Sequence, residues 1–317
     1  MAKLPGEAEY PIAAVSKLTG VSCHALRVWE RRYGFPRPKR SASGHRRYGH
    51  DQVVLLRRVS ELSQTGRSIG DLIVEARAGT LSVEAESGPG AIEERDDGDG
   101  REVAEFIDRM LDGDLARGDA CFTRLAGSLG ETELVGRVIA PALIETGERW
   151  FRQQCTIYQE RIVSGFLRRK LDAMIEAART ANVEPRQTVV LGTVQGDRHE
   201  GGVLMAHLLL ERKRWRVVSL GVDVPVSEIA GAVERFRPDA LALSFVLSRN
   251  INKRFGELAE IRGVPIFVGG RSILNYQRLA RRHGLIPVAG AVTTAIEQLI
   301  TEFGAWKRGL EGERVRR

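Results

Sequence analysis

The chain has 317 residues, of which 43% are hydrophobic, and a formal net charge of +7, values ordinary for a protein of two or three domains. No apolar run is long enough for a membrane span or a signal peptide. The three cysteines are scattered and odd in number, which argues against a disulfide framework or zinc-site spacing and favours a reducing cytoplasm.

The positive charge is concentrated near the N-terminus. Residues 1–79 hold fourteen Lys and Arg against seven Asp and Glu, whereas residues 80–101 hold seven acidic and two basic residues. A localised basic patch on a small domain is typical of nucleic-acid binders, although many basic surfaces have no such role.

A helix-turn-helix pattern opens the first domain. Residues 10–19 read as a short helix, Gly20 as a turn, and Ser22 as the N-cap of a second helix over 23–33. The apolar side chains of the second helix, Leu26 and Trp29, would face a core. Its basic side chains, Arg27, Arg31 and Arg32, would face outward. Such a helix can enter the major groove of DNA.

Residues 34–48 are rich in Pro, Gly, Ser and basic residues and read as a basic wing. The motifs Leu26-Arg27-x-Trp29-Glu30-x-Arg32-Tyr33-Gly34 and Gly44-His45-Arg46-x-Tyr48 resemble the MerR family of winged-helix transcription regulators. The resemblance implies that the second helix contacts the DNA groove or its phosphates and that the wing contacts the neighbouring DNA backbone. The candidate DNA-binding residues are Arg27, Arg31, Arg32, Tyr33, Arg40, His45, Arg46, Arg47 and Tyr48.

Two amphipathic helices, over 51–64 and 68–78, complete a domain that we place at residues 1–79. The buried face of the first would consist of Val53, Leu55, Leu56, Val59 and Leu62. Residues 80–101 are rich in Gly, Glu and Asp and have almost no apolar side chains, so we expect a flexible acidic linker.

Residues 102–184 have apolar side chains at helical spacing, which predicts a bundle of four or five helices. We expect interruptions near Gly113, Gly118, Gly130 and Pro141, because glycine and proline are poor in helix interiors.

Residues 185–317 alternate apolar strands with helices. The expected strands are 188–194, 217–220, 240–247, 265–268 and 286–289, and residues 305–317 read as a polar, basic tail. Near-continuous apolar strands separated by helices favour a parallel sheet covered on both faces. The fold class is therefore multi-domain, α and α/β, with a flavodoxin-like, doubly wound C-terminal domain.

His199 stands in the stretch from Val194 to Gly202, between the first of these strands and a helix over 203–212. Such loops lie at the carboxyl edge of a parallel sheet, where ligands bind. An imidazole can bind a metal there, and Asp197 is close enough to hydrogen-bond its second nitrogen. The alternative is a capping loop with a surface histidine.

Three pieces of sequence together resemble the binding motif of corrinoid proteins. They are Asp197-x-His199-x-x-Gly202, Ser244 in Leu243-Ser244-Phe245-Val246, and the pair Gly269-Gly270; the second piece departs slightly, with Val246 where leucine is usual. The resemblance implies cobalamin as cofactor, His199 as lower axial ligand of cobalt, Ser244 against the displaced nucleotide base, and the glycine pair lining the channel of that base.

Trp150, followed after nine residues by Glu160, resembles the segment that covers the upper face of the cofactor in light-responsive repressors of the MerR family. The segment departs from the relatives at two positions. Arg161 replaces a histidine, and Phe151 replaces the histidine that captures cobalt after photolysis in the relatives. The photolysed adduct of the relatives therefore cannot form here. Alternatively, Trp150 is a core aromatic residue and Glu160 an exposed acid.

In the same relatives a loop acid pairs with the arginine beside the ligand histidine of a neighbouring subunit. The resemblance thus implies an intersubunit ion pair between Arg198 and Asp223 in a dimer or tetramer. Two solvated charges that contribute little are the alternative.

Together these features predict a cytoplasmic, non-enzymatic DNA-binding transcription regulator, a repressor whose oligomeric state and operator binding are controlled by adenosylcobalamin and light. Phe151 and Arg161 leave methylcobalamin, hydroxocobalamin, haem or no cofactor open. One alternative is a MerR-type regulator that responds to haem or a partner protein. Another is a corrinoid protein for methyl transfer, which would gain nothing obvious from a winged helix.

Overall fold

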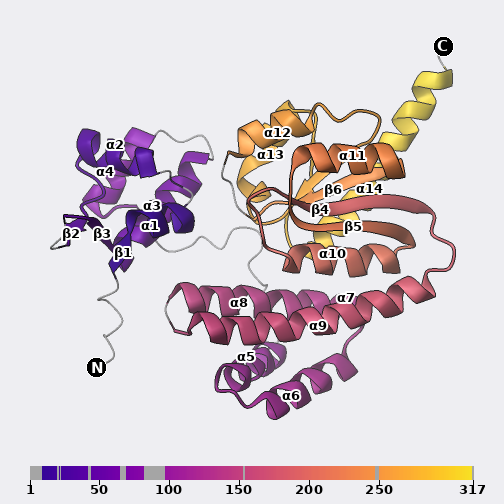
Figure 1. Cartoon of the computed structure of the whole chain (residues 1–317), viewed down its shortest axis with the longest axis horizontal. Coiled ribbons are helices and arrows are strands. Elements are labelled where there is room, and N and C mark those ends of the chain that lie inside the picture. Colours follow the sequence, from indigo (N-terminus) through magenta and orange to yellow (C-terminus); the bar gives the residue numbers. More distant parts are fainter. Residues whose placement is uncertain are drawn as a thin grey trace. The chain divides into compact units, whose positions relative to one another are not determined.

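A computed structural model describes residues 9–19, 21, 23–41, 44–64, 69–81, 97–152, 154–246 and 250–315 of the chain. The chain divides into two compact units, Met1–Pro89 and Gly90–Arg317 (Figure 1). None of the helices in these described ranges combines the length and the apolar character needed to cross a membrane.

The first unit is helical, with a small antiparallel sheet. Its elements are β1 (Glu9–Pro11), α1 (Ile12–Thr19), α2 (Cys23–Tyr33), β2 (Lys39–Arg40), β3 (Arg46–Gly49), α3 (His50–Gln64) and α4 (Ile69–Ala78). Strand β3 is central and pairs with β1 on one side and β2 on the other. The segment between α2 and α3 is thus a β-hairpin, which confirms the expected wing.

The core of this unit follows the helical spacing. In α2 the buried side chains are Leu26 and Trp29, as predicted. On the expected apolar face of α3, Val53, Leu56 and Val59 are buried. Leu55 and Leu62 on the same face are half-buried. The expected turn at Gly20 and N-cap at Ser22 lie outside the described residues.

Both ends of the predicted acidic linker, residues 80–101, differ from the expectation, and residues 82–96 lie outside the described residues. Helix α5 (Asp97–Leu111) begins inside the range 80–101, and Leu81 at the other end is buried. Acidic residues are favourable at a helix N-terminus because they face its unpaired backbone N–H groups, so Asp97 and Asp99 are compatible with the start of a helix. Composition by itself does not distinguish such a start from a linker.

The helical bundle consists of α5, α6 (Leu115–Ser128), α7 (Glu131–Leu134), the π-helical turn η1 (Val135–Ile139), α8 (Ala140–Phe151) and α9 (Ile157–Ala181). Gly113 and Gly130 lie between helices, as expected. The expected break at Gly118 is wrong, because this glycine is buried within α6 and its missing Cβ makes room for Met110 of α5. Pro141 occupies the first turn of α8, where a missing N–H is tolerated, so it does not interrupt the chain of helices.

The rest of the second unit alternates strands and helices. They are β4 (Gln187–Val194), α10 (Gly201–Arg212), β5 (Trp215–Val224), α11 (Val226–Phe236), β6 (Ala240–Ser244), α12 (Ile251–Leu258), β7 (Ile266–Gly269), α13 (Ile273–Arg282), β8 (Ile286–Pro287) and α14 (Val292–Val315). All strand pairs are parallel, in the order β5-β4-β6-β7-β8. This is the flavodoxin-like order, which confirms the predicted fold class.

Helices cover both faces of this sheet (Figure 1). Helices α10 and α14 share one hydrophobic core with the bundle, and α11, α12 and α13 form a second core on the opposite face. The expected tail at 305–317 is wrong for residues 305–315, which continue α14. Phe303 in this helix packs against Trp215, and the ring of Trp306 stacks on Phe303.

Candidate functional site

The loop that carries His199 joins the end of β4 to the start of α10. The sheet register aligns Thr193 with Ser244, and Ser244 with Gly269, so the ends of β4, β6 and β7 meet at one edge. This places two of the three corrinoid motif pieces directly beside the loop that contains the third.

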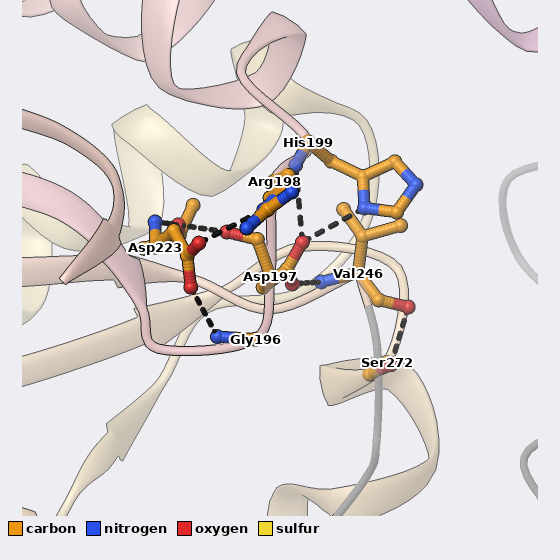
Figure 2. A network of polar contacts seen from close by, with 8 residues as sticks. Gly196, Asp197, Arg198, His199, Asp223, Val246 and Ser272 are labelled. Carbon is orange, nitrogen blue, oxygen red and sulfur yellow. Dashed lines mark hydrogen bonds and ion pairs between the residues drawn. The ribbon is translucent and has the colours of Figure 1, made fainter. Parts of the chain in front are cut away.

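Asp197 orients the imidazole of His199. The carboxylate Oδ1 lies 2.8 Å from Nδ1 of His199 and accepts a hydrogen bond from its backbone N–H at 3.2 Å. The side chain of Asp197 is only 2% exposed, whereas that of His199 is 52% exposed. In the neutral tautomer that donates from Nδ1 to this carboxylate, Nε2 keeps its lone pair and faces away from Asp197 (Figure 2). A neutral imidazole oriented in this way fits a cobalt ion.

The other carboxylate oxygen of Asp197 is held by the neighbouring strand. Val246, just beyond β6, donates its backbone N–H to Oδ2 at 2.7 Å, and the hydroxyl of Ser272 donates to the carbonyl of Val246 at 2.8 Å (Figure 2). Val246 therefore acts through its backbone, so valine in place of the usual leucine leaves this contact intact. Sequence reasoning missed Ser272, for which a hydroxyl just after the glycine pair is the only signal.

The motif glycines lie close to neighbouring side chains or backbone, so a Cβ at these positions would be crowded. A Cβ on Gly202 would lie 3.2 Å from Oγ of Ser244, and one on Gly269 would lie 3.2 Å from Cγ2 of Val288. Gly270 has φ +93°, and a Cβ there would lie 2.6 Å from the carbonyl oxygen of Phe245. Gly270 is thus required by packing within the chain, while Gly202 keeps the space beside Ser244 open.

The bundle meets the carboxyl edge of the sheet at three points. Arg168 of α9 pairs with Glu200 at 3.2 Å, and Arg271 pairs with Glu148 of α8 at 3.1 Å. Between them, a Cβ on Gly201 would lie 2.9 Å from Cδ1 of Leu143 on α8. Helices α8 and α9 therefore lie directly against the carboxyl edge of the sheet.

Trp150 follows Leu143 by two helical turns, so it is on the face of α8 that meets the loop. Its side chain is 43% exposed, which makes it an exposed aromatic rather than a core residue. Glu160 near the start of α9 is half-buried and lies 3.4 Å from Arg161, the residue that replaces the expected histidine. Both positions are compatible with a group bound between the bundle and the sheet edge.

The ion pair of Arg198 with Asp223 is made within one chain. Nε of Arg198 lies 2.8 Å from Oδ2 of Asp223 (Figure 2). Parallel pairing of β4 with β5 brings the end of β5 beside the His199 loop, which explains the contact within the chain. The pair between subunits stays a prediction. The amide of Gly196 and the guanidinium of Arg198 hold the pKa of the Asp223 carboxyl below its ordinary value.

The outer face of α2 carries the predicted DNA-binding side chains. Arg27, Arg31 and Arg32 are exposed and Tyr33 is half-buried. The guanidinium of Arg32 lies over the ring of Tyr33, 5.3 Å from its centroid. This face is free to approach a DNA groove.

The wing is tied to α2 by Glu30, whose role sequence reasoning missed. Glu30 accepts a hydrogen bond from Nε of Arg46 at 2.5 Å and lies 3.6 Å from Nη2 of Arg40. The bond to Glu30 raises the pKa of Arg46. An acid in the middle of a basic helix was the available signal. His45 and Arg40 are exposed and Arg47 is half-buried.

Tyr48 is wrong as a DNA contact. Its side chain is fully buried in the core of the first unit, so it cannot reach a phosphate. The alternation of β3 explains the error, because a strand turns successive side chains to opposite faces and Tyr48 takes the inner one.

These observations define a class of protein: a winged helix-turn-helix domain joined to a helical bundle and a flavodoxin-like domain with an oriented histidine at its ligand-binding edge. Comparison with known families agrees. Residues 10–74 match the MerR HTH family regulatory protein, and residues 187–300 match the B12 binding domain.

The chain is 31% identical over 287 residues to the HTH-type transcriptional repressor CarH of Myxococcus xanthus, with 87% of this chain and 93% of that protein covered. It is 32% identical to CarA of the same organism, with 82% and 85% covered. The monomethylamine corrinoid protein of Methanosarcina barkeri shares the fold, with a TM-score of 0.51 and 13% identity over 63% of this chain and 97% of that chain. The chain belongs to the family of MerR-type transcription regulators with a B12 binding domain.

Proposed function

We propose that this protein is a cytoplasmic transcriptional repressor whose oligomeric state and operator binding are controlled by cobalamin, most simply adenosylcobalamin, and by light. The observation that carries the proposal is the pair Asp197 and His199, a buried carboxylate that holds Nδ1 and leaves Nε2 free, in the same chain as a winged helix. The two HTH-type transcriptional repressors of Myxococcus xanthus, similar over most of their length, support the repressor part of this proposal.

The residues present fit the corrinoid. His199 would bind cobalt through Nε2, Gly202 and Ser244 would admit the displaced base beside them, and Trp150 and Glu160 would cover the upper face. When bound, adenosylcobalamin supplies a cobalt–carbon bond that light can cleave. A ligand held between the bundle and the sheet edge would favour one arrangement of the bundle relative to the sheet. That arrangement would in turn favour one oligomeric state.

The oligomer would determine DNA affinity through multivalency. Several winged helices held on one assembly bind neighbouring sites with a high effective concentration, whereas separate copies bind one at a time. Exposed arginines of α2 would supply most of the affinity through phosphates, and few residues would read bases.

A regulator of the same family that responds to haem or a partner protein is the main alternative. A response to a partner protein gives no reason for the buried carboxylate of Asp197 to hold Nδ1 of His199. Haem iron could also take Nε2, but haem gives no reason for Gly202 to leave space beside Ser244. A corrinoid protein for methyl transfer would need the His199 loop but has no use for the N-terminal domain.

The test is an absorption titration of the full chain with adenosylcobalamin in the dark. We expect the wild-type protein and His283→Ala, which removes a half-buried imidazole elsewhere in the same unit, to retain the corrinoid through gel filtration and to show the same bound spectrum. His199→Ala should lose affinity or change the spectrum. Absence of binding by the wild-type protein, or an identical spectrum with His199→Ala, would contradict the proposal.

A further inference from the structure

Asp223 at the end of β5 has a left-handed backbone, with φ 64°, which side chains other than asparagine and aspartate seldom adopt. This conformation directs both its amide and its carboxylate toward one loop. The amide donates to the carbonyl of Asp197 at 3.0 Å and to the hydroxyl of Thr193 at 2.9 Å. The carboxylate accepts from the amide of Gly196 at 2.7 Å and from Nε of Arg198 at 2.8 Å (Figure 2).

The sheet places Asp223 there through an irregular register. Pairing of β4 with β5 shifts on either side of Gly192 and ends with Val194 opposite Val224. The chain then makes a tight turn, in which the amide of Asp197 donates to the carbonyl of Val194 at 3.0 Å and Gly196 has φ +94°. Asp223 bonds to both sides of that turn.

Asp197 is consequently fixed from two directions. Its carbonyl is held by Asp223 and by the hydroxyl of Thr193 at 2.5 Å, and its carboxylate is held by Val246. Because that carboxylate orients His199, any movement of the turn moves the imidazole. Loss of such supporting contacts around a metal ligand commonly lowers metal affinity by about 10- to 100-fold.

We propose that Asp223 is a positioning residue for His199, which acts within its own chain by clamping the turn at Gly196 to Arg198. The proposal rests on the proposed function in one respect, that His199 binds the cobalt of a corrinoid. The role is one within the chain, since Asp223 bonds to Thr193 near the end of β4 and to Gly196, Asp197 and Arg198 in the loop that follows.

The four contacts of Asp223 are not equal. Arg198 is 82% exposed, so its ion pair is surrounded by water and contributes little. The bond from the Gly196 amide to a carboxylate is short and charge-assisted, and it is the contact that restrains the turn. The clamp should therefore depend on an oxygen acceptor at position 223 and be insensitive to the charge at position 198.

Three variants separate these contacts. Asp223→Gly keeps the left-handed backbone without strain and removes the carboxylate. Asp223→Asn tolerates the same backbone and keeps an oxygen acceptor for Gly196. Arg198→Gln is the matched control, because it removes only the ion pair.

The first measurement is amide hydrogen exchange of the full-length protein without cofactor, over the segment 193–200. We expect faster exchange in Asp223→Gly, less change in Asp223→Asn, and wild-type exchange in Arg198→Gln. Unchanged exchange in Asp223→Gly would overturn the proposal. This readout needs no corrinoid, so it decides the clamp even if the wild-type protein binds none and the proposed function fails.

The second measurement is the dissociation constant for adenosylcobalamin in the dark, with sedimentation of the same samples. We expect Asp223→Gly to bind about tenfold more weakly and Arg198→Gln within about twofold of wild type. If instead Asp223→Gly lowers the oligomer order while its corrinoid affinity stays at the wild-type value, Asp223 acts between subunits and the proposal is wrong.

Discussion

At the scale of single residues, burial decides what a titratable group can do. His199 is half exposed and held by a buried acid, which suits a ligand. The side chain of His207, eight residues later on α10, is only 13% exposed, and its Nε2 lies 3.8 Å from Oε1 of Glu211 without a hydrogen bond. Glu211 is itself buried and accepts hydrogen bonds from Asn182 at 2.7 Å and from the amide of Val217 at 3.0 Å. The two histidines, one in the loop before α10 and one on that helix, therefore have unlike roles.

His207 predicts a pH dependence of stability. Burial lowers its pKa, against opposing contributions from Glu211 and from Asp172 of α9. The folded protein thus prefers the neutral imidazole more than the unfolded chain does, so the stability from this group is present above the unfolded pKa of about 6.5 and is lost as pH falls below it. Urea unfolding at pH 7.5 and 5.5 should show a smaller loss of stability at low pH for His207→Gln than for wild type. His283→Gln serves as control, and an equal loss in His207→Gln and wild type would contradict the assignment.

At the scale of elements, contacts between helix and hairpin determine the DNA-binding surface. Glu30 joins α2 to β2 and β3 through Arg40 and Arg46, two residues expected from sequence to bind phosphate. A half-buried acid that holds two arginines fixes the separation of helix and wing. Groove contacts from α2 and backbone contacts from the wing can then be made together.

Glu30→Gln should weaken operator binding about tenfold, because losing a charged hydrogen bond costs on the order of 1.5 kcal/mol and frees the wing. Affinity for random-sequence DNA should be unchanged or higher, since the variant loses one negative charge and its net charge becomes more positive. Arg32→Ala is the contrasting variant. It should weaken binding to operator DNA and to random-sequence DNA alike, and reduce the salt dependence of binding by about one phosphate contact. Mobility-shift titrations at several salt concentrations distinguish the two, and an equal loss on both DNAs for Glu30→Gln would refute the positioning role.

At the scale of the whole molecule, the second unit has the means to couple ligand and assembly. Its bundle and sheet share a hydrophobic core, and ion pairs from α8 and α9 reach the loops around His199. A ligand bound at this edge must contact both parts of the unit. The state of the ligand can therefore alter the surface that the unit offers to a second copy.

This coupling predicts a light-dependent assembly. Sedimentation of the full chain with adenosylcobalamin should show a larger species in the dark than after illumination, and DNA affinity should fall with it by roughly 10²-fold or more as multivalency is lost. The same illumination without cofactor is the control. If the corrinoid-bound protein sediments equally in the dark and after illumination, the proposed response to light is wrong.

The sequence by itself determined the features that depend on near neighbours along the chain. Helical and strand periodicity predicted the winged helix, the bundle and the doubly wound sheet, and short motifs located His199, Asp197 and the basic face of α2. These features could be read because capping, turn chemistry and amphipathic spacing act within a few residues.

Only the tertiary structure decided which distant groups meet. Residues 25 or more apart in sequence form the pairs of Arg198 with Asp223 and Val246 with Ser272, and Asp197 receives the amide of a residue 49 positions away. The burial of Tyr48 and the bond from Glu30 to Arg46 depend likewise on strand facing and on the packing of the hairpin against α2. Such contacts follow from the register of strands and the docking of helices, which local sequence does not specify, because both are set by the packing of whole elements.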